Sequence, residues 1–285
     1  MNACSVSNLT KHYPGFDLGP VSFQVPAGTI MGFVGENGAG KTTTIKSLLG
    51  IVRPDGGEVA LLGGPYSGEE RALKERLGVV FAESHFHDNL TLGDVDRILG
   101  RIYRTWDRGW FRQACERFEL PGGKAVKDYS KGMQMKLNIL AALAHHPTLL
   151  ILDEATSGLD PIVREQMLDL FLEFMQDETH AILFSSHITS DLDKIADAIT
   201  FIHQGQIVFS KSRDALMDEM GVIRVGEQQL RSLPAGQVVR VRRDAFGVEA
   251  LVQDRVAVAQ RLPGVHAERV NIEQIMLFYV RGEAL

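Results

Sequence analysis

Residues 35–42 are Gly35-Glu36-Asn37-Gly38-Ala39-Gly40-Lys41-Thr42, and this stretch decides the fold. It has the spacing of a phosphate-binding loop (P-loop), between an apolar run at 29–34 and a helical pattern at 41–49. The glycines let successive backbone N–H groups close around phosphates, and the start of the following helix adds a favourable dipole. A flexible glycine turn is the plain alternative, but motif and context together argue against it. The sequence predicts a strand, loop and helix unit that binds a nucleotide.

The P-loop residues have separate predicted tasks. Lys41 reaches the β- and γ-phosphates, and the Thr42 hydroxyl binds Mg²⁺. The predicted ATP contacts within this segment are Gly35, Glu36, Asn37, Gly38, Ala39, Gly40, Lys41, Thr42 and Thr43.

A second apolar run, 149–152, ends in the two carboxylates Asp153 and Glu154. This pattern is typical of a Walker B strand, in which the Asp holds the Mg²⁺ shell and the next Glu is the general base that acts on water. A buried strand that ends in an acidic turn is an equally common alternative for the run alone. Beside a P-loop the catalytic interpretation is favoured.

Composition limits the classes of protein that remain. The chain has 285 residues, of which 45% are hydrophobic and 23% charged, and a net charge of -6. An acidic balance argues against an extended nucleic-acid surface, although a local basic patch is compatible with it. Cys4 and Cys115 are too few for a disulfide framework or a four-ligand zinc site, so both are interpreted as reduced thiols in a cytosolic compartment.

Neither a secretory leader nor a membrane span is expected. The first 15 residues lack a basic start followed by an apolar run. The longest apolar stretches, 137–144 and 149–152, are far shorter than the roughly 20 residues that span a bilayer. If the protein serves a membrane, another chain must cross it.

The order of patterns predicts an α/β fold. Short β-rich runs at 5–9 and 21–25 precede the P-loop, and 91–144 is helical throughout, as an insert in the α/β core. Alternation then resumes with strands at 149–152, 181–185 and 198–202 and with helices after Pro161 and at 189–196. From 213 to 285 the character changes, with a β-rich segment at 237–241 and a final helix at 272–280, which predicts a separate small domain.

These motifs in this order resemble the nucleotide-binding domain of an ATP-binding cassette (ABC) transporter across residues 1 to about 212. The resemblance implies a P-loop NTPase core with an N-terminal antiparallel β subdomain, an α-helical subdomain at about 90–146, and a small C-terminal α+β domain at 213–285. It also places the family signature at Ser130-Lys131-Gly132, where Ser130 and Gly132 cap the γ-phosphate bound by a partner's P-loop. As bare chemistry, Ser130 is equally a helix N-cap, and both roles can coexist. Lys131 replaces an expected glycine.

The resemblance assigns three further residues, each with a plain alternative. Asp160 falls in the D-loop that crosses the dimer interface, but a tight turn before Pro161 explains it as well. His187 matches the switch histidine that contacts the γ-phosphate, whereas a lone His after a strand is usually structural. Tyr13 lies where an aromatic stacks on adenine, or it packs beside a strand. The other histidines, including His85, His87, His145 and His146, are interpreted as structural.

One expected glutamine is missing. The Q-loop position falls at Ala82, whose side chain can neither bind a metal nor orient water. Glu83 follows, and it replaces the glutamine only if the loop shifts by one residue.

The resemblance implies an active ATPase with Mg-ATP as substrate, from an exporter of the ABC-2 or drug- and bacitracin-resistance type. Its partners are integral membrane permease subunits and a second nucleotide-binding subunit, identical or not, with no nucleic acid. The resemblance further implies that the chain lies in the cytoplasm, against the membrane. A soluble ABC ATPase in DNA repair, cluster assembly or translation is the first alternative, and a non-catalytic regulatory module is the second. The cargo is set by the membrane chain.

Overall fold

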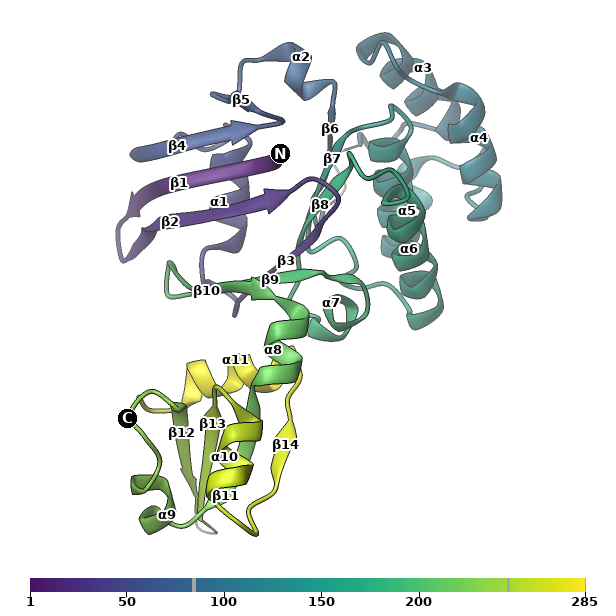
Figure 1. Ribbon diagram of the computed structural model, residues 1–285. Helices are drawn as coiled ribbons and strands as arrows, with labels where there is room; N and C mark the ends of the chain where they lie inside the picture. The colour runs from purple at the N-terminus through teal and green to yellow at the C-terminus, as the bar shows by residue number, and fades with distance from the viewer. Residues whose placement is uncertain (84–85, 245–246, 285) are drawn as a thin grey trace.

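The computed structural model describes residues 1–83, 86–244 and 247–284. Within them, a central six-stranded sheet has the order β10-β9-β3-β8-β7-β6 (Figure 1). Its strands pair in parallel except β10, which runs antiparallel to β9 at one edge. The strands are β3 (Ile30–Val34), β6 (Leu77–Val80), β7 (Leu149–Asp153), β8 (Ala181–Ser185), β9 (Ala198–His203) and β10 (Gln206–Ser212).

Continuous apolar runs form the middle strands because both faces of the sheet are covered. Every residue of β3, β7 and β8 is buried, as expected of a parallel sheet between two layers. Successive side chains of a strand alternate between faces, so Leu149 and Ile151 enter one core while Leu150 and Leu152 enter the other. The α/β prediction is confirmed.

Helices cover one face of this sheet, and an N-terminal sheet with one helix covers the other (Figure 1). On the first face lie α5 (Lys131–Leu143), α6 (Pro161–Phe174) and α7 (Thr189–Ile195). On the second lies α1 (Lys41–Leu48), with the antiparallel sheet β2-β1-β4-β5. The strands of that sheet are β1 (Asn2–Tyr13), β2 (Phe16–Pro26), β4 (Gly56–Leu61) and β5 (Gly64–Pro65).

The predicted helical insert is present. After the short α2 (Arg71–Lys74) and β6, it comprises α3 (Leu92–Ile102), α4 (Arg108–Arg117) and a 3-10 turn at Val126–Asp128 before α5. Thr91 and Asp94 form a capping box that starts α3, and Asp107 caps α4. Such caps satisfy the unpaired N–H groups of a first turn.

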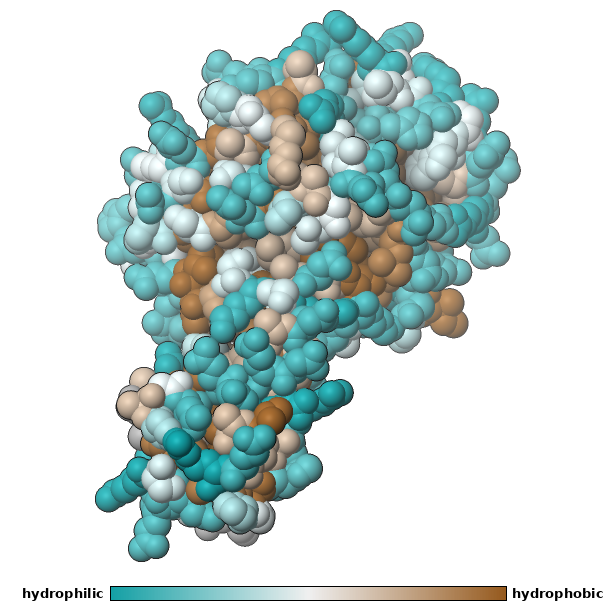
Figure 2. Space-filling view, viewed as in Figure 1, coloured by the Kyte–Doolittle hydropathy of each residue, from teal (hydrophilic) through white to brown (hydrophobic). Residues whose placement is uncertain are grey.

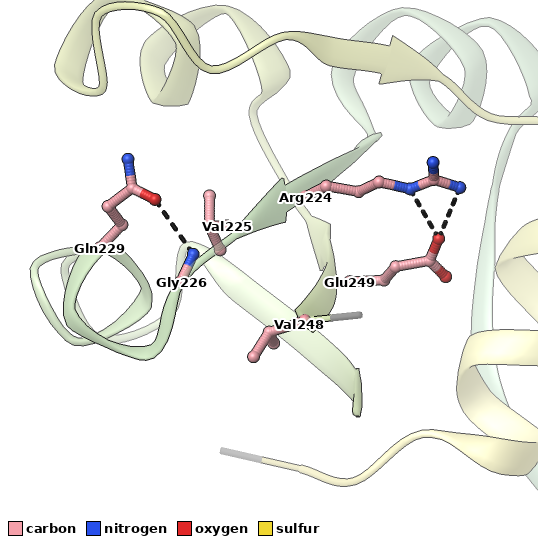
Figure 3. Close-up of a pocket in the computed structure, with 7 residues that line it drawn as sticks. Arg224, Val225, Gly226, Gln229, Val248 and Glu249 are labelled. Carbon is pink, nitrogen blue, oxygen red and sulfur yellow. Dashed lines mark hydrogen bonds and ion pairs between the residues drawn. The ribbon is translucent and has the colours of Figure 1, made fainter. Parts of the chain in front are cut away.

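Residues after β10 build a third sheet with the order β12-β13-β11-β14. Its elements are α8 (Arg213–Glu219), β11 (Gly221–Val225), α9 (Glu227–Arg231), β12 (Val238–Asp244), β13 (Gly247–Val252), α10 (Arg255–Arg261), β14 (Ala267–Arg269) and α11 (Ile272–Arg281). Arg224 of β11 pairs with Glu249 of β13 at 2.9 Å, and this pair is drawn in Figure 3. The division of the chain at 212 stays a prediction.

The last helix lies between this sheet and the central unit (Figure 1). Ile275 and Phe278 of α11 share a core cluster with Leu192 and Ile195 of α7. The backbone N–H of Ile272 also donates to Asp193 Oδ1 at 3.4 Å. The end of the chain therefore covers α7.

The viewed surface is mostly hydrophilic, with apolar patches gathered mainly on the central unit (Figure 2). Among the described residues, no helix is both long and apolar enough to cross a bilayer.

Candidate active site

A cavity of about 590 Å³ opens at the P-loop. Its walls come from the P-loop, from the turns after β6 and β7 and from the loop after β8, because the carboxyl ends of parallel strands meet at one edge of a sheet. The lining residues are Phe16, Asn37, Gly38, Gly40, Lys41, Thr42, Thr43, Ala82, Glu154, Ser157 and His187. The structure thus brings part of the predicted P-loop together with Ala82, Glu154 and His187.

Lys41 is buried at the floor of this cavity. Its Nζ donates to the carbonyl oxygens of Gly35 at 2.8 Å and Glu36 at 3.2 Å. It also lies 3.6 Å from Glu154 Oε1. Gly40 has φ 108°, and a Cβ there would lie 2.7 Å from Leu18, so only glycine fits. The Lys41 ammonium group is thus held where it could donate hydrogen bonds to a bound phosphate.

Asp153 ends β7 beside the cavity and is buried. Burial raises the pKa of its carboxyl, and the neighbouring Thr42 hydroxyl opposes this. Its Oδ1 lacks a hydrogen-bond partner among the described residues. An unpartnered carboxylate oxygen beside a hydroxyl fits a hard cation such as Mg²⁺. Among the described residues, no cluster of three or more His, Cys, Asp or Glu side chains could hold a metal ion by itself.

The Glu154 carboxylate lies between two cavity residues. Oε1 faces Lys41, while Oε2 contacts His187 Nδ1 and accepts from the His187 backbone N–H at 3.3 Å. Glu154 has φ 57°, a left-handed conformation uncommon outside glycine. Its own N–H donates to Ser185 O at 2.9 Å. This turn sends the Glu154 side chain into the cavity although Asp153 remains in the sheet.

The predicted signature and D-loop residues lie elsewhere. Ser130 caps α5 and accepts from Met133 N–H at 3.2 Å, and Asp160 caps α6 by accepting from two backbone N–H groups at 3.0 and 3.1 Å. Ser130, Lys131 and Asp160 are exposed, Gly132 is half-buried, and none of them lines the described cavity. Their capping geometry is present, whereas their roles toward a partner stay predictions.

The Q-loop position is occupied by a methyl group. Ala82, which holds the Q-loop position counted from the sequence, lines the cavity. Glu83 instead lines a neighbouring hollow of about 190 Å³ with Leu99, Tyr103 and His145. The two residues thus line different spaces, and the Q-loop role of either one stays a prediction.

Phe16 is a cavity residue that sequence reasoning missed. Tyr13, the predicted adenine-stacking residue, is its direct partner across the β1–β2 turn. Paired residues on antiparallel strands point to the same face, so both aromatics flank the P-loop side of the hairpin, but of these two only Phe16 lines the described cavity. The two-residue turn Pro14-Gly15 was the signal that fixes this register.

Other histidines and both cysteines take structural positions. His145 is buried, stacks on Tyr103 at 4.0 Å and contacts Leu77 O through Nε2 at 3.0 Å. His146 lies 3.3 Å from Asp107, and His87 accepts from Asn89 N–H at 3.4 Å. His85 lies outside the described residues. Burial raises the pKa of both the Cys4 and Cys115 thiols to about 12, which disfavours the thiolate form.

Comparisons with known proteins agree with this geometry. Residues 18–157 match the family model described as ABC transporter. An uncharacterized ABC transporter ATP-binding protein of Synechocystis is 31% identical over 94% of this chain and 79% of its own length. The bacitracin transport ATP-binding protein BcrA of Bacillus licheniformis is 34% identical over 71% of this chain and 67% of its own length. The daunorubicin/doxorubicin resistance ATP-binding protein DrrA of Streptomyces peucetius is 32% identical over 84% and 75%.

Solved structures show the same fold. An ATP-binding subunit of an ABC transporter superposes with a TM-score of 0.68 at 25% identity, over 75% of this chain and 91% of that one. The dimeric cassette MJ0796, bound to ADP and Pi, has a TM-score of 0.64 at 21% identity, over 73% and 98%. A P-loop, a carboxylate held between Lys41 and His187, and relatives of this length and identity together place the chain in the ABC transporter family, as an ATP-binding subunit with ATPase activity.

Proposed function

We propose that this chain hydrolyses Mg-ATP at a site completed by a second nucleotide-binding subunit, and that it powers export through separate membrane subunits. The observation that carries the proposal is the Glu154 carboxylate, which contacts His187 and lies 3.6 Å from Lys41. A base, a phosphate-binding cation and a hydrogen-bonding imidazole thus surround one cavity.

The cavity residues divide the chemistry of hydrolysis. Backbone N–H groups of the P-loop and the Lys41 ammonium group bind the phosphates. When Lys41 binds a phosphate, its contacts with the carbonyl oxygens of Gly35 and Glu36 weaken. Glu154 accepts a proton from the attacking water. Because His187 Nδ1 contacts Glu154, Nε2 is the nitrogen that would donate to the γ-phosphate. Preorganised donors of this kind stabilise the charge that develops on the transferred group.

Thr42 and Asp153 would hold Mg²⁺, which neutralises phosphate charge when bound. The support is the buried, unpartnered Oδ1 of Asp153 beside the Thr42 hydroxyl. Asp153 must be ionised for this task, and its raised pKa is one that a bound cation would lower.

The second subunit would bring its own Ser130, Lys131 and Gly132 to the γ-phosphate, with Asp160 near the same interface. Support comes from their position: Ser130, Lys131 and Asp160 are exposed at the starts of α5 and α6, away from their own chain's cavity. A helix start with a neighbouring lysine attracts an anion.

Residues 1–212 would act as the ATPase and 213–285 as an accessory domain. The separate sheet after Ser212 and its own core around Ile223, Val241 and Ala250 support this division.

Phe16 and Tyr13 would form an aromatic wall against the adenine of ATP, and substitution of each residue tests this role. Phe16→Ala is expected to raise the KM for ATP by roughly two- to twelvefold, because an aromatic contact is worth about 0.5–1.5 kcal/mol. Tyr13→Ala, on the same face, is expected to act in the same direction. Steady-state ATP hydrolysis measures this, with Phe16→Tyr as the matched control that keeps a ring. An unchanged KM in both alanine variants contradicts the stacking role.

The proposal of export through a permease is supported by the names of BcrA and DrrA, which are transport and resistance proteins. The chain would then lie at the cytoplasmic face of the membrane. We expect the tagged full chain, isolated in mild detergent, to carry a polytopic membrane protein in fixed stoichiometry. An untagged chain in the same cells is the control. Co-isolation with ribosomes or DNA, and with no membrane protein, favours the soluble alternative instead.

A further inference from the structure

A second, buried contact joins the two segments that carry Glu154 and His187. Thr156 follows Glu154 by two residues, and Asp191 follows His187 by four on the first turn of α7. Thr156 Oγ1 donates to Asp191 Oδ2 at 2.8 Å. Thr156 is fully buried and Asp191 is 2% exposed. Neither residue of this contact lines the described cavity.

Arg164 of α6 adds a third member. Its Nε lies 4.0 Å from the same Asp191 oxygen, and its guanidinium donates to Leu159 O at 3.0 Å. Leu159 and Thr156 both belong to the turn 154–160, where the Leu159 N–H also contacts Thr156 O at 3.3 Å. One carboxylate thus restrains this turn directly at Thr156 and, through Arg164, near its far end.

Keeping a charge there is costly for stability. Burial raises the pKa of the Asp191 carboxyl, which Thr156, Arg164 and Lys194 oppose and Glu165 reinforces. Buried ion pairs are often no more stabilising than apolar side chains of similar volume. Their hydrogen bonds are directional, however, and so they fix the positions of the groups that they join. The arrangement is therefore better explained by position than by stability.

We propose that Asp191 is a positioning residue for hydrolysis: by holding Thr156 and Arg164, it keeps the turn 154–160 in register with the loop that carries His187. Glu154 and His187 then meet over the cavity at fixed places. The inference rests on the proposed role of Glu154 as the base. Displacing a catalytic group by about 1 Å can lower a rate about a hundredfold.

Thr156→Val tests the link with little change in volume. We expect kcat for ATP hydrolysis by the full chain to fall about tenfold, while the KM for ATP stays within about twofold because the P-loop is untouched. Thr156→Ser restores the hydroxyl and should keep most of kcat. Asp191→Asn, which retains the shape but loses the charge toward Arg164, should also lower kcat more than it raises KM.

Another ion pair supplies the matched control. Arg117 and Glu173 join α4 to α6 through an exposed pair that does not act on Asp191, so Glu173→Gln should leave kcat unchanged. Thermal unfolding without nucleotide shows whether each variant is folded. Unchanged kcat in folded Thr156→Val, or an equal loss in Thr156→Ser, overturns the inference. After such a result, Glu154→Gln in the same assay separates the two failures. An inactive Glu154→Gln means that only the inference about Asp191 fails, whereas an active Glu154→Gln means that the proposed function fails.

Discussion

Glu154→Gln is expected to lower the kcat of ATP hydrolysis about a hundredfold or more while ATP still binds. A glutamine amide has nearly the same size and can keep its oxygen near Lys41, as Glu154 does at 3.6 Å, but it cannot take a proton from water. General-base catalysis typically contributes 10²–10⁴-fold. Phosphate release by the full chain with Mg²⁺ measures turnover, and equilibrium binding of ATP measures affinity.

Two controls isolate this effect. Glu165→Gln makes the same chemical change at an exposed position and should leave turnover unaffected. Chelation of Mg²⁺ in the wild type should abolish hydrolysis, since Thr42 and Asp153 would lose the cation between them and the phosphates. Wild-type turnover in Glu154→Gln would remove this residue from the chemistry.

Mixing two inactive variants is expected to restore about a quarter of wild-type hydrolysis. Lys41→Ala removes the phosphate-binding cation, and Ser130→Asp keeps a helix cap while setting a negative charge against the γ-phosphate. If each site combines the P-loop of one chain with Ser130 of another, random pairing makes half of the dimers mixed. Each mixed dimer then holds one intact site out of two.

The mixing experiment separates shared sites from independent ones. Each variant alone should be nearly inactive, and each should retain the wild-type unfolding temperature to within a few degrees. Full activity of Ser130→Asp alone, or no recovery on mixing, would mean that Ser130 does not complete a neighbour's site. Activity is read as phosphate release at a concentration above that at which the wild-type rate per chain becomes constant.

Local sequence predicted the central strands well because their hydrophobic runs are uninterrupted. The strand 181–185 and the start of the helix at Pro161 agree with β8 and α6. β4 was not predicted, since Gly56-Gly57-Glu58 has no apolar alternation; it is a strand because it pairs with β1. Pairing with a distant neighbour overrides weak local preference.

The candidate site was predictable where a motif is continuous and less so where contacts are distant. Lys41 and Glu154 follow from short motifs, and His187 joins them because β7 and β8 are neighbours. Phe16 depended on a hairpin register, and Asp191 on the packing of α7 against the turn after β7. Neither leaves a pattern in a single sequence, because each depends on residues far apart in the chain.

The position of α11 also bears on how the protein is made. Its residues cover α7, yet they are synthesised well after it. Translation adds about 5–20 residues per second, so the roughly 85 residues from Ala196 to Arg281 take about 4–17 s. Throughout that interval Leu192 and Ile195 lack their final cover. The nascent chain therefore leaves this apolar surface of α7 uncovered until α11 has been synthesised.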